Sequence, residues 1–445
     1  MEQTQSSHSP KRQLSYFDAV AIVVGMVIGA GIFRTPSVVA QHTADAQTFL
    51  WVWVIGAVIS FIGALCYAEL CTAFPHTGGD YHFIYKAFGP KPAFLFAWAR
   101  MTVIQTGSIA LLAYIFGDYM SYVYSLGPHS PMLYASAVVL VLTLINVAGI
   151  QSGTAVQKLF TLVEVGGILL IIIAGLCILN GDHAMGDLPI QSEDNDNYWG
   201  LALVFVLLTF GGWNEAAYIS AELKVGQKGM VKALMLSLFL IAVIYLVINM
   251  AYLKVLGHQG IANSTAVGAD VMQAAWGNTG VWLIGLFVAI SSLTSANATI
   301  FTGARSNYAL GKDFKAFSIL GRWNNQAKGP VNALLLQGGI SILLIGLGFF
   351  SRSGFETIVD YTAPVFWFFF LLVGISVFVL RKKAPDTPRP FKVPLYPVVP
   401  LIFCMSSAYL LYSSIMHTGL GALFGIGIML LGGIILYLLP KDMKV

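Results

Sequence analysis

The stretch Gly25-Met26-Val27-Ile28-Gly29-Ala30-Gly31-Ile32-Phe33 lies in the middle of the first long apolar segment and decides how that segment folds. Glycine is about 1 kcal/mol less favourable than alanine inside a helix. The sixth apolar segment carries a similar cluster, Phe210-Gly211-Gly212-Trp213-Asn214-Glu215. Glycine-interrupted segments in matching positions of two halves are typical of inverted repeats with a binding site at the breaks. Close helix packing through small residues, for which Gly25 and Gly29 have the right spacing, is the alternative.

The rest of the chain is apolar enough to lie in a membrane. Of its 445 residues, 57% are hydrophobic and 10% are charged, whereas a water-soluble domain carries about 25% charged residues. Runs of about 20 apolar residues are long enough to cross a hydrocarbon core as helices. We therefore predict an all-α integral membrane protein with twelve transmembrane helices, at 16–40, 49–74, 92–124, 131–150, 156–180, 199–222, 231–257, 279–308, 330–350, 355–380, 394–416 and 419–439.

The basic residues predict how these helices are oriented. With twelve spans, both termini lie on one side, and that side holds all of the 24 Lys and Arg residues except Arg34, Arg100, Lys254 and Arg352. The connection 181–198 on the other side has five acidic residues and no basic one. Since Lys and Arg are enriched in cytoplasmic loops, we expect both termini in the cytoplasm and the chain in the plasma or inner membrane of the cell.

Neither an enzyme nor a covalently linked partner is expected from the sequence. It contains no G-x-S-x-G or H-E-x-x-H motif, and its four cysteines (Cys66, Cys71, Cys177 and Cys404) all lie inside predicted spans. We therefore expect no catalytic residues, no metal, no cofactor and no disulfide-linked partner subunit. The formal net charge of +4 reflects the cytoplasmic bias of Lys and Arg and does not indicate nucleic-acid binding.

The two glycine clusters are suited to bind a zwitterion. At a break in a helix, the freed backbone N–H groups and the positive end of the half-helix dipole favour an anion. Gly29, Ala30 and Gly31 would offer such donors to a carboxylate. The backbone of 208–212 would offer carbonyl oxygens to an ammonium group. Neither interaction needs a metal ion or a catalytic side chain.

Five short motifs resemble those of the amino acid–polyamine–organocation superfamily, and most closely its L-type amino-acid transporter branch. They follow in order along 16–400: Ile28–Phe33, Gly78–Tyr81, Gly211–Asn214, Phe301–Arg305 and Arg389–Pro394. The resemblance implies a LeuT-like fold with five-plus-five inverted repeats, two additional helices, and breaks in helices 1 and 6. In this interpretation 1–15 is a cytoplasmic tail, 16–390 is the transport core, and 391–445 holds helices 11 and 12 and the C-terminus.

The resemblance also implies which residues bind the substrate. They are Val27, Ile28, Gly29, Ala30 and Gly31 in the first break, Leu208, Phe210, Gly211 and Asn214 in the second, and Trp367 in the tenth span. Two of them depart from the family. Ala30 stands where relatives have serine, and Leu208 stands where relatives often have a bulky gating aromatic. Trp367 is either a side-chain-recognition residue or a packing residue at the membrane interface.

Charged residues in the third and fifth spans depart from the family as well. Arg100 aligns with an acid of relatives and Glu164 with a lysine, which in those relatives takes the place of sodium. Because ions at bilayer depth are costly, such residues usually pair. Glu164 therefore either pairs with Arg100, or titrates as a proton site, or lies in another register. Glu215 and Ser295 are candidates for tuning the substrate or a proton, with local hydrogen bonding and helix packing as the alternatives.

Together these features predict a sodium-independent amino-acid transporter that works by alternating access, as an exchanger. Neutral amino acids are favoured, because they are the substrates of the branch. Glu164 and Glu215 leave a proton-coupled symporter, or a transporter of cationic amino acids or polyamines, as the alternatives. A channel or a non-transporting nutrient sensor would share the architecture. The expected partners are the amino acid and the lipid bilayer.

Overall fold

A computed structural model describes residues 20, 23–25, 27–76, 78–149, 154–177, 199–215, 226–324, 329–350, 354–417 and 419–438. Within these ranges every regular element is a helix, and the only β-type pairing is an isolated bridge between Asn324 and Gly329. The all-helical class predicted from the sequence is therefore confirmed.

The main helices are long and follow one another with short connections. Their bounds are α2 (Thr35–Gln41), α3 (Ala46–Ala73), α4 (Gly79–Phe88), α5 (Pro90–Ala99), α6 (Gln105–Val123), α7 (Ser130–Val147), α8 (Thr154–Cys177), α9 (Trp199–Thr209), α11 (Gly226–Asn263), α12 (Val267–Asp313), α13 (Val331–Leu347), α14 (Gly354–Lys383), α15 (Val398–His417) and α16 (Gly419–Leu438). Short turns of 3-10 helix are η1 (Ala30–Phe33), η3 (Trp213–Glu215), η5 (Lys315–Phe317) and η6 (Gly348–Phe350), and η2 (Arg100–Ile104) is a π-helical turn.

Eight helices of the described part are long and apolar enough to cross a membrane, and three further apolar helices are shorter. The short ones are Leu162–Leu176, Trp199–Thr209 and Val331–Leu347. Two of the longest helices are kinked, α11 at Gly257 and α12 at Trp276 and Gly277. These kinks fall next to the predicted boundaries of the spans at 231–257 and 279–308, because glycine at positive φ ends regular helix there.

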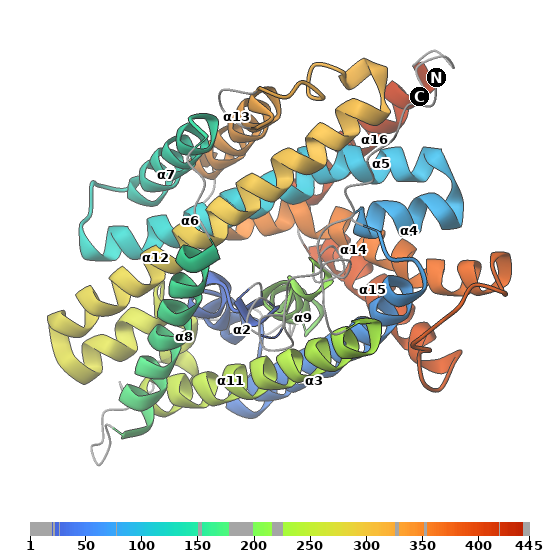
Figure 1. Cartoon of the computed structure of the whole chain (residues 1–445). Coiled ribbons are helices and arrows are strands. Elements are labelled where there is room, and N and C mark those ends of the chain that lie inside the picture. Colours follow the sequence, from blue (N-terminus) through green and yellow to red (C-terminus); the bar gives the residue numbers. More distant parts are fainter. Residues whose placement is uncertain are drawn as a thin grey trace.

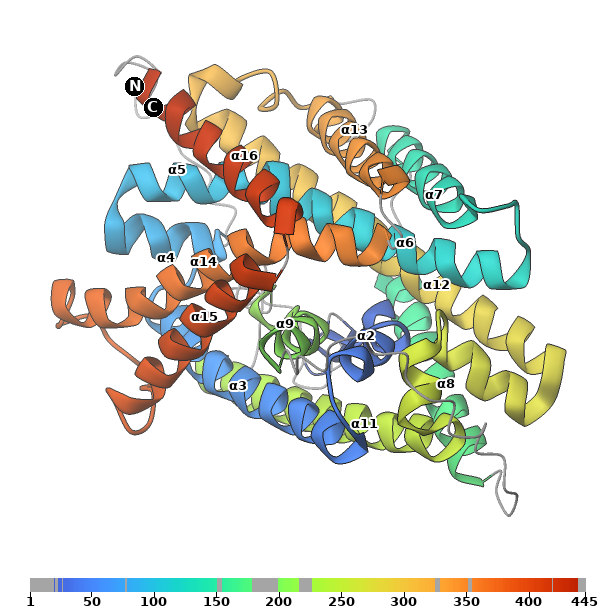
Figure 2. The same ribbon diagram turned by 180° about the vertical axis from the view of Figure 1, so that it is seen from behind.

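The short helices α2 and α9 lie side by side in the middle of the bundle (Figures 1 and 2). Around them stand α3, α11 and α15, which contact α2 or α9, and α6 and α12, which contact the turn η1. The two glycine clusters are at the inner ends of this central pair. The fold therefore brings the two segments that the sequence singled out into contact, surrounded by longer helices.

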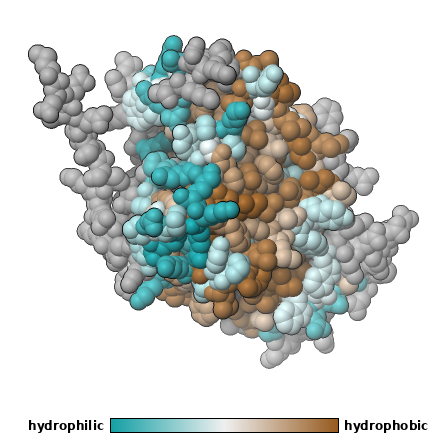
Figure 3. All heavy atoms as spheres, turned by 90° about the vertical axis from the view of Figure 1, so that its right-hand side faces the viewer, coloured by the Kyte–Doolittle hydropathy of each residue, from teal (hydrophilic) through white to brown (hydrophobic). Residues whose placement is uncertain are grey.

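The outer helices present apolar side chains on their surface. Leu144 of α7, Leu343 of α13 and Leu430 of α16 are all more than half exposed. Figure 3 shows a broad hydrophobic area on one face of the molecule, bordered by hydrophilic residues. A water-soluble protein rarely exposes so large an apolar area, so this surface suits contact with lipid.

Candidate functional site

The first break interrupts the chain between Val27 and the turn η1. Gly29 has an extended backbone (φ −114°, ψ −174°) and its N–H donates to the carbonyl of Val27 at 2.9 Å. The helix restarts in a 3-10 turn, where the N–H of Arg34 donates to the carbonyl of Gly31 at 3.0 Å. The first N–H groups of such a turn have no partner within it, so the predicted donors at Ala30 and Gly31 face the break.

The second break follows the last residue of α9, Thr209. The N–H of Gly211 donates to the carbonyl of Leu208 at 3.1 Å, and the N–H of Gly212 to the side-chain oxygen of Asn214 at 3.3 Å. Gly212 has φ +102°, a conformation that side chains other than glycine rarely adopt. This glycine explains why the helix ends here and restarts as η3.

The two breaks touch each other. A Cβ added to Gly31 would lie 3.5 Å from the side chain of Thr209. The hydroxyl of Thr209 donates to the carbonyl of Phe205 at 2.9 Å and lies 2.6 Å from the hydroxyl of Thr35 at the start of α2. Carbonyl ends and N–H ends of two half-helices thus meet in one buried place, the arrangement expected for binding both ends of a zwitterion.

Tyr245 of α11 joins the two breaks and was missed by the sequence analysis. Its hydroxyl lies 3.0 Å from the carbonyl oxygen of Val27 and 3.3 Å from that of Thr209. Its ring packs on Phe210 and Trp53, with centroids 5.0 and 5.8 Å away. No local pattern marks it, because a single tyrosine within an apolar span is read as packing.

The remaining predicted binding residues are buried or partly buried, and Trp367 lies farther from the breaks in the chain of contacts. Val27, Ile28, Ala30, Phe210 and Asn214 are buried and Leu208 is partly buried. Trp367 of α14 is also buried, but it packs on Phe366 and Phe370. Its indole N–H has no hydrogen-bond partner among the described residues. Phe370 in turn contacts Trp213 of η3, so Trp367 is linked to the second break through an aromatic cluster.

Glu164 points at α12, and its described hydrogen bond is to that helix, whereas the predicted pair with Arg100 stays a prediction. The carboxylate of Glu164 is buried and accepts a hydrogen bond from Ser291 at 3.0 Å. Ser295 lies behind the first break, 3.8 Å from a Cβ added to Gly29. Helix α8 packs on α11 and α12, and the π-helical turn of Arg100 packs mainly on α6, α5, α14 and α16 and also contacts α12 and α13. The side chain of Glu215 lies outside the described residues.

Arg34, directly after the first break, is a buried charged residue. It is 7% exposed and lies 3.6 Å from both Asp118 of α6 and Glu356 of α14. It also lies within 3.4 Å of the carbonyl of Ser264, between α11 and α12. Four separate parts of the chain therefore meet around this guanidinium.

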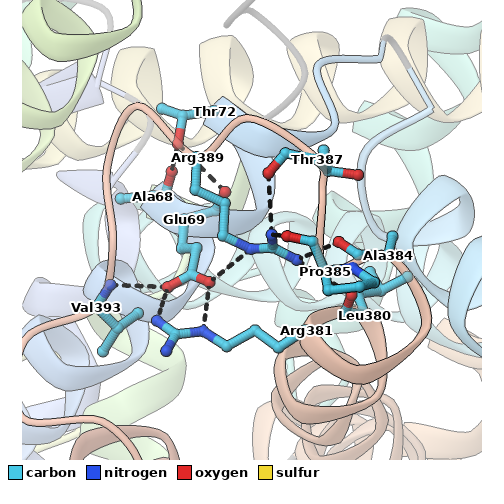
Figure 4. A network of polar contacts seen from close by, with 10 residues as sticks. All are labelled: Ala68, Glu69, Thr72, Leu380, Arg381, Ala384, Pro385, Thr387, Arg389 and Val393. Atoms are coloured by element: carbon cyan, nitrogen blue, oxygen red, sulfur yellow. Dashed lines mark hydrogen bonds and ion pairs between the residues drawn. The ribbon is translucent and has the colours of Figure 1, made fainter.

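Glu69 is the centre of a second ion cluster, at the opposite end of α14 (Figure 4). Although it lies near the end of α3, it is 2% exposed. Arg381 donates to it from Nε at 2.7 Å, Nε of Arg389 lies 3.4 Å away, and the N–H of Val393 donates at 2.7 Å. Arg389 also donates to the carbonyls of Leu380, Ala384, Pro385 and Thr387. The motif Arg389–Pro394 thus closes the end of α14 and binds it to α3.

The described residues contain no group of three or more His, Cys, Asp or Glu side chains that could hold a metal ion. Cys66, Cys71 and Cys404 are free and buried, and the side chain of Cys177 lies outside the described residues. What the breaks offer is backbone donors and acceptors for a small ligand with opposite charges.

Comparison with known proteins gives the same picture. The sequence profile of the family described as amino acid permease matches residues 14–439. The chain is 30% identical to the b(0,+)-type amino acid transporter 1 of Rattus norvegicus, over 97% of this chain and 88% of the relative. It is 28% identical to the protein of that name from Homo sapiens, over 98% and 91%. It is 30% identical to the large neutral amino acids transporter small subunit 2 of Oryctolagus cuniculus, over 95% and 79%.

Proposed function

The chain belongs to the amino acid permease family, and from this premise we propose that it exchanges amino acids across a cell membrane without sodium, by alternating access. The observation that carries the proposal is the contact between the two glycine breaks, Gly31 against Thr209, in the middle of the bundle. Facing breaks of this kind bind substrates in transporters with inverted repeats. The family is not a family of enzymes, and the relatives are named as amino acid transporters.

The finer architecture belongs to the same proposal. Twelve spans, of which the first ten form five-plus-five inverted repeats over 16–390, fit the eight long and three shorter apolar helices together with the broken first span. Spans 11 and 12 are then α15 and α16 within 391–445. Both termini lie in the cytoplasm, as the distribution of Lys and Arg in the sequence favours.

We assign the two ends of the substrate to the two breaks. At Gly29, Ala30 and Gly31 the carboxylate binds the backbone N–H groups of Ala30 and Gly31, because the N–H of Gly29 already donates to the carbonyl of Val27. The ammonium binds carbonyl oxygens around Leu208 and Gly211. Phe210, Asn214 and Trp367 border or approach the space for the side chain. The described side chains nearest the breaks are mostly uncharged, which favours neutral amino acids.

Counterflow in proteoliposomes tests this function directly. Vesicles preloaded with an unlabelled neutral amino acid should accumulate the labelled one, at the same rate in sodium and in choline. Empty vesicles should accumulate little, because an exchanger needs a substrate on both sides. Equal slow entry into loaded and empty vesicles would indicate a channel, and specific binding without entry would indicate a sensor.

Glu164 favours one second candidate, a proton-coupled symporter. Its described hydrogen-bond partner is an uncharged hydroxyl, that of Ser291 at 3.0 Å. A buried carboxyl group without a cation can bind a proton during transport. If Glu164→Gln abolishes uptake driven by an inward proton gradient but leaves counterflow intact, the chain is a symporter. If the variant changes neither, Glu164 has a structural role.

A further inference from the structure

The connection between α14 and α15 contains an exposed apolar turn, residues 394–398. All five of its residues are exposed and none is charged. Leu395 is 77% exposed, Tyr396 41% and Val398 52%. The connection projects from the side of the bundle, where the ribbon changes from orange to red (Figures 1 and 2). Leu395 also has φ +49°, a backbone conformation that is unfavourable for leucine. An exposed leucine gains nothing in water that offsets this cost.

The neighbouring residues hold the 394–398 turn in one conformation. Before the turn, the N–H of Val393 donates to the carboxylate of Glu69 at 2.7 Å. Within it, the carbonyl of Leu395 accepts from the N–H of Val398 at 2.8 Å. The guanidinium carbon of Arg381 lies 3.8 Å from the ring centroid of Tyr396. The turn is therefore preorganised to present Leu395, so that a ligand bound there orders little additional backbone.

The 394–398 turn continues the lipid-facing side of α15. Leu401, Met405 and Tyr412 of this helix are each at least 50% exposed. With Val398 they recur at intervals of three, four and seven residues, which places them on one face of a helix. Residues 398–416 are apolar and long enough to cross a membrane. The turn at the start of this helix therefore lies where hydrocarbon meets the lipid headgroups, the depth at which tyrosine is common.

The charge next to the turn is positive. Residues 381–397 contain five basic residues and one acidic one. Arg381 binds Glu69, and Lys383 donates to a backbone carbonyl of α4 at 3.0 Å. Lys382 and Lys392 are exposed, and each belongs to a segment that contacts the turn or leads into it. An apolar turn with exposed lysines beside it matches the two parts of an anionic phospholipid, acyl chain and phosphate.

We propose that the 394–398 turn and the two lysines form a binding site for an anionic phospholipid. Leu395 and Tyr396 contact the acyl chains near the headgroup, and Lys382 and Lys392 bind the phosphate. The bound lipid covers Tyr396, whose ring covers Arg381, so it protects from water the ion cluster that joins α14 to α3. The inference requires a membrane protein but does not depend on which substrate the chain transports.

The position of the turn is tested with a fluorescent dye in proteoliposomes. Leu395→Cys and Asp386→Cys are each labelled with the environment-sensitive dye NBD, and the labelled wild-type chain gives the background of the native cysteines. Asp386 is an exposed residue of the same connection. Lipids that carry a nitroxide near the headgroup should quench the dye at 395 at least twice as strongly as the dye at 386. Equal quenching would overturn the proposal and leave the turn to contact a protein. If Leu395→Cys gives no folded protein, Val398→Cys replaces it.

The role of the lysines is tested in detergent. Phosphatidylglycerol should raise the Tm of the wild-type protein, whereas phosphatidylcholine and glycerol 3-phosphate at the same concentration should not. Lys382→Gln and Lys392→Gln should each increase the phosphatidylglycerol concentration needed for half of this rise about fivefold. Lys91→Gln, which removes an exposed lysine at the start of α5, should leave it unchanged. Equal values for the three variants would refute the site, and an equal rise with glycerol 3-phosphate would assign it to free phosphate.

Discussion

Replacing Glu69 by glutamine should destabilise the protein strongly, although glutamine has nearly the same shape. The carboxylate is 2% exposed and neutralises two arginines. The Arg381 side chain is 20% exposed and that of Arg389 is 8% exposed, so neither guanidinium is well hydrated. Breaking a buried ion pair costs about 3–5 kcal/mol. Arg389 keeps its four carbonyl partners and glutamine keeps one acceptor oxygen, so we expect the lower end, about 3 kcal/mol.

The chain provides its own reporters for this experiment. Cys66 and Cys71 are buried in α3, the helix that carries Glu69, so a thiol-reactive dye detects unfolding in detergent. Asp386→Asn is the matched control, because Asp386 is an exposed acid in the connection that Glu69 binds. Its removal changes the net charge equally without breaking a buried pair. If the Tm of Glu69→Gln lies within about 1 °C of that of Asp386→Asn, the buried cluster does not hold α3 and α14 together.

Four further outcomes are expected. Gly31→Val should abolish uptake in a protein that still folds, because the added methyl groups would overlap Thr209, whose side chain lies 3.5 Å from an added Cβ; normal uptake would place the site elsewhere. Replacing sodium by choline should leave the uptake rate unchanged, and a several-fold loss would contradict sodium independence. Amines that lack the carboxylate should compete poorly, since they cannot bind the N–H groups of the first break; strong competition would favour a polyamine transporter. Burial lowers the pKa of His82 to about 4, so the Tm should fall as the pH is lowered from about 6.5 to 4, where only the unfolded chain takes up this proton. The Tm of His82→Gln should depend less on pH in this range, and an unchanged dependence would contradict the prediction.

Much of the fold could be predicted because it depends on local chemistry. Apolar runs of sufficient length gave helices at nearly the predicted positions, and the described backbone leaves regular helix at Gly29 and Gly212, within the two glycine clusters. Backbone conformation explains this success. Gly212 needs a positive φ, and a glycine in the middle of an apolar run signals that need in the sequence itself.

The side-chain network could not be predicted in the same way, because its partners are far apart in the sequence. Glu69 and Arg381 are 312 positions apart, and Tyr245 meets a carbonyl 218 positions away. The environment of Glu164 shows the same limit. Its sequence position left a pair with Arg100, a proton site and another register open, whereas the packing of α8 against α12 directs Glu164 toward Ser291, 127 positions away.

Helix α14 is bound by an ion pair at each end, Glu356 to Arg34 and Arg381 to Glu69, and it contains Pro364 in between. A proline inside a helix removes one backbone hydrogen bond, so α14 can bend near Pro364 while each end stays bound by its own ion pair. Breaking one ion pair releases only the half of α14 that this pair holds. The difference in stability between the two pairs therefore contributes to the population of each orientation of α14. The Glu356 side chain is 37% exposed and that of Glu69 is 2% exposed. Because water weakens an exposed ion pair, the pair between Glu356 and Arg34 is the weaker of the two. We therefore expect antibodies or inhibitors that stabilise one orientation of α14 to be selected more readily against the Glu356→Gln variant than against the wild-type chain.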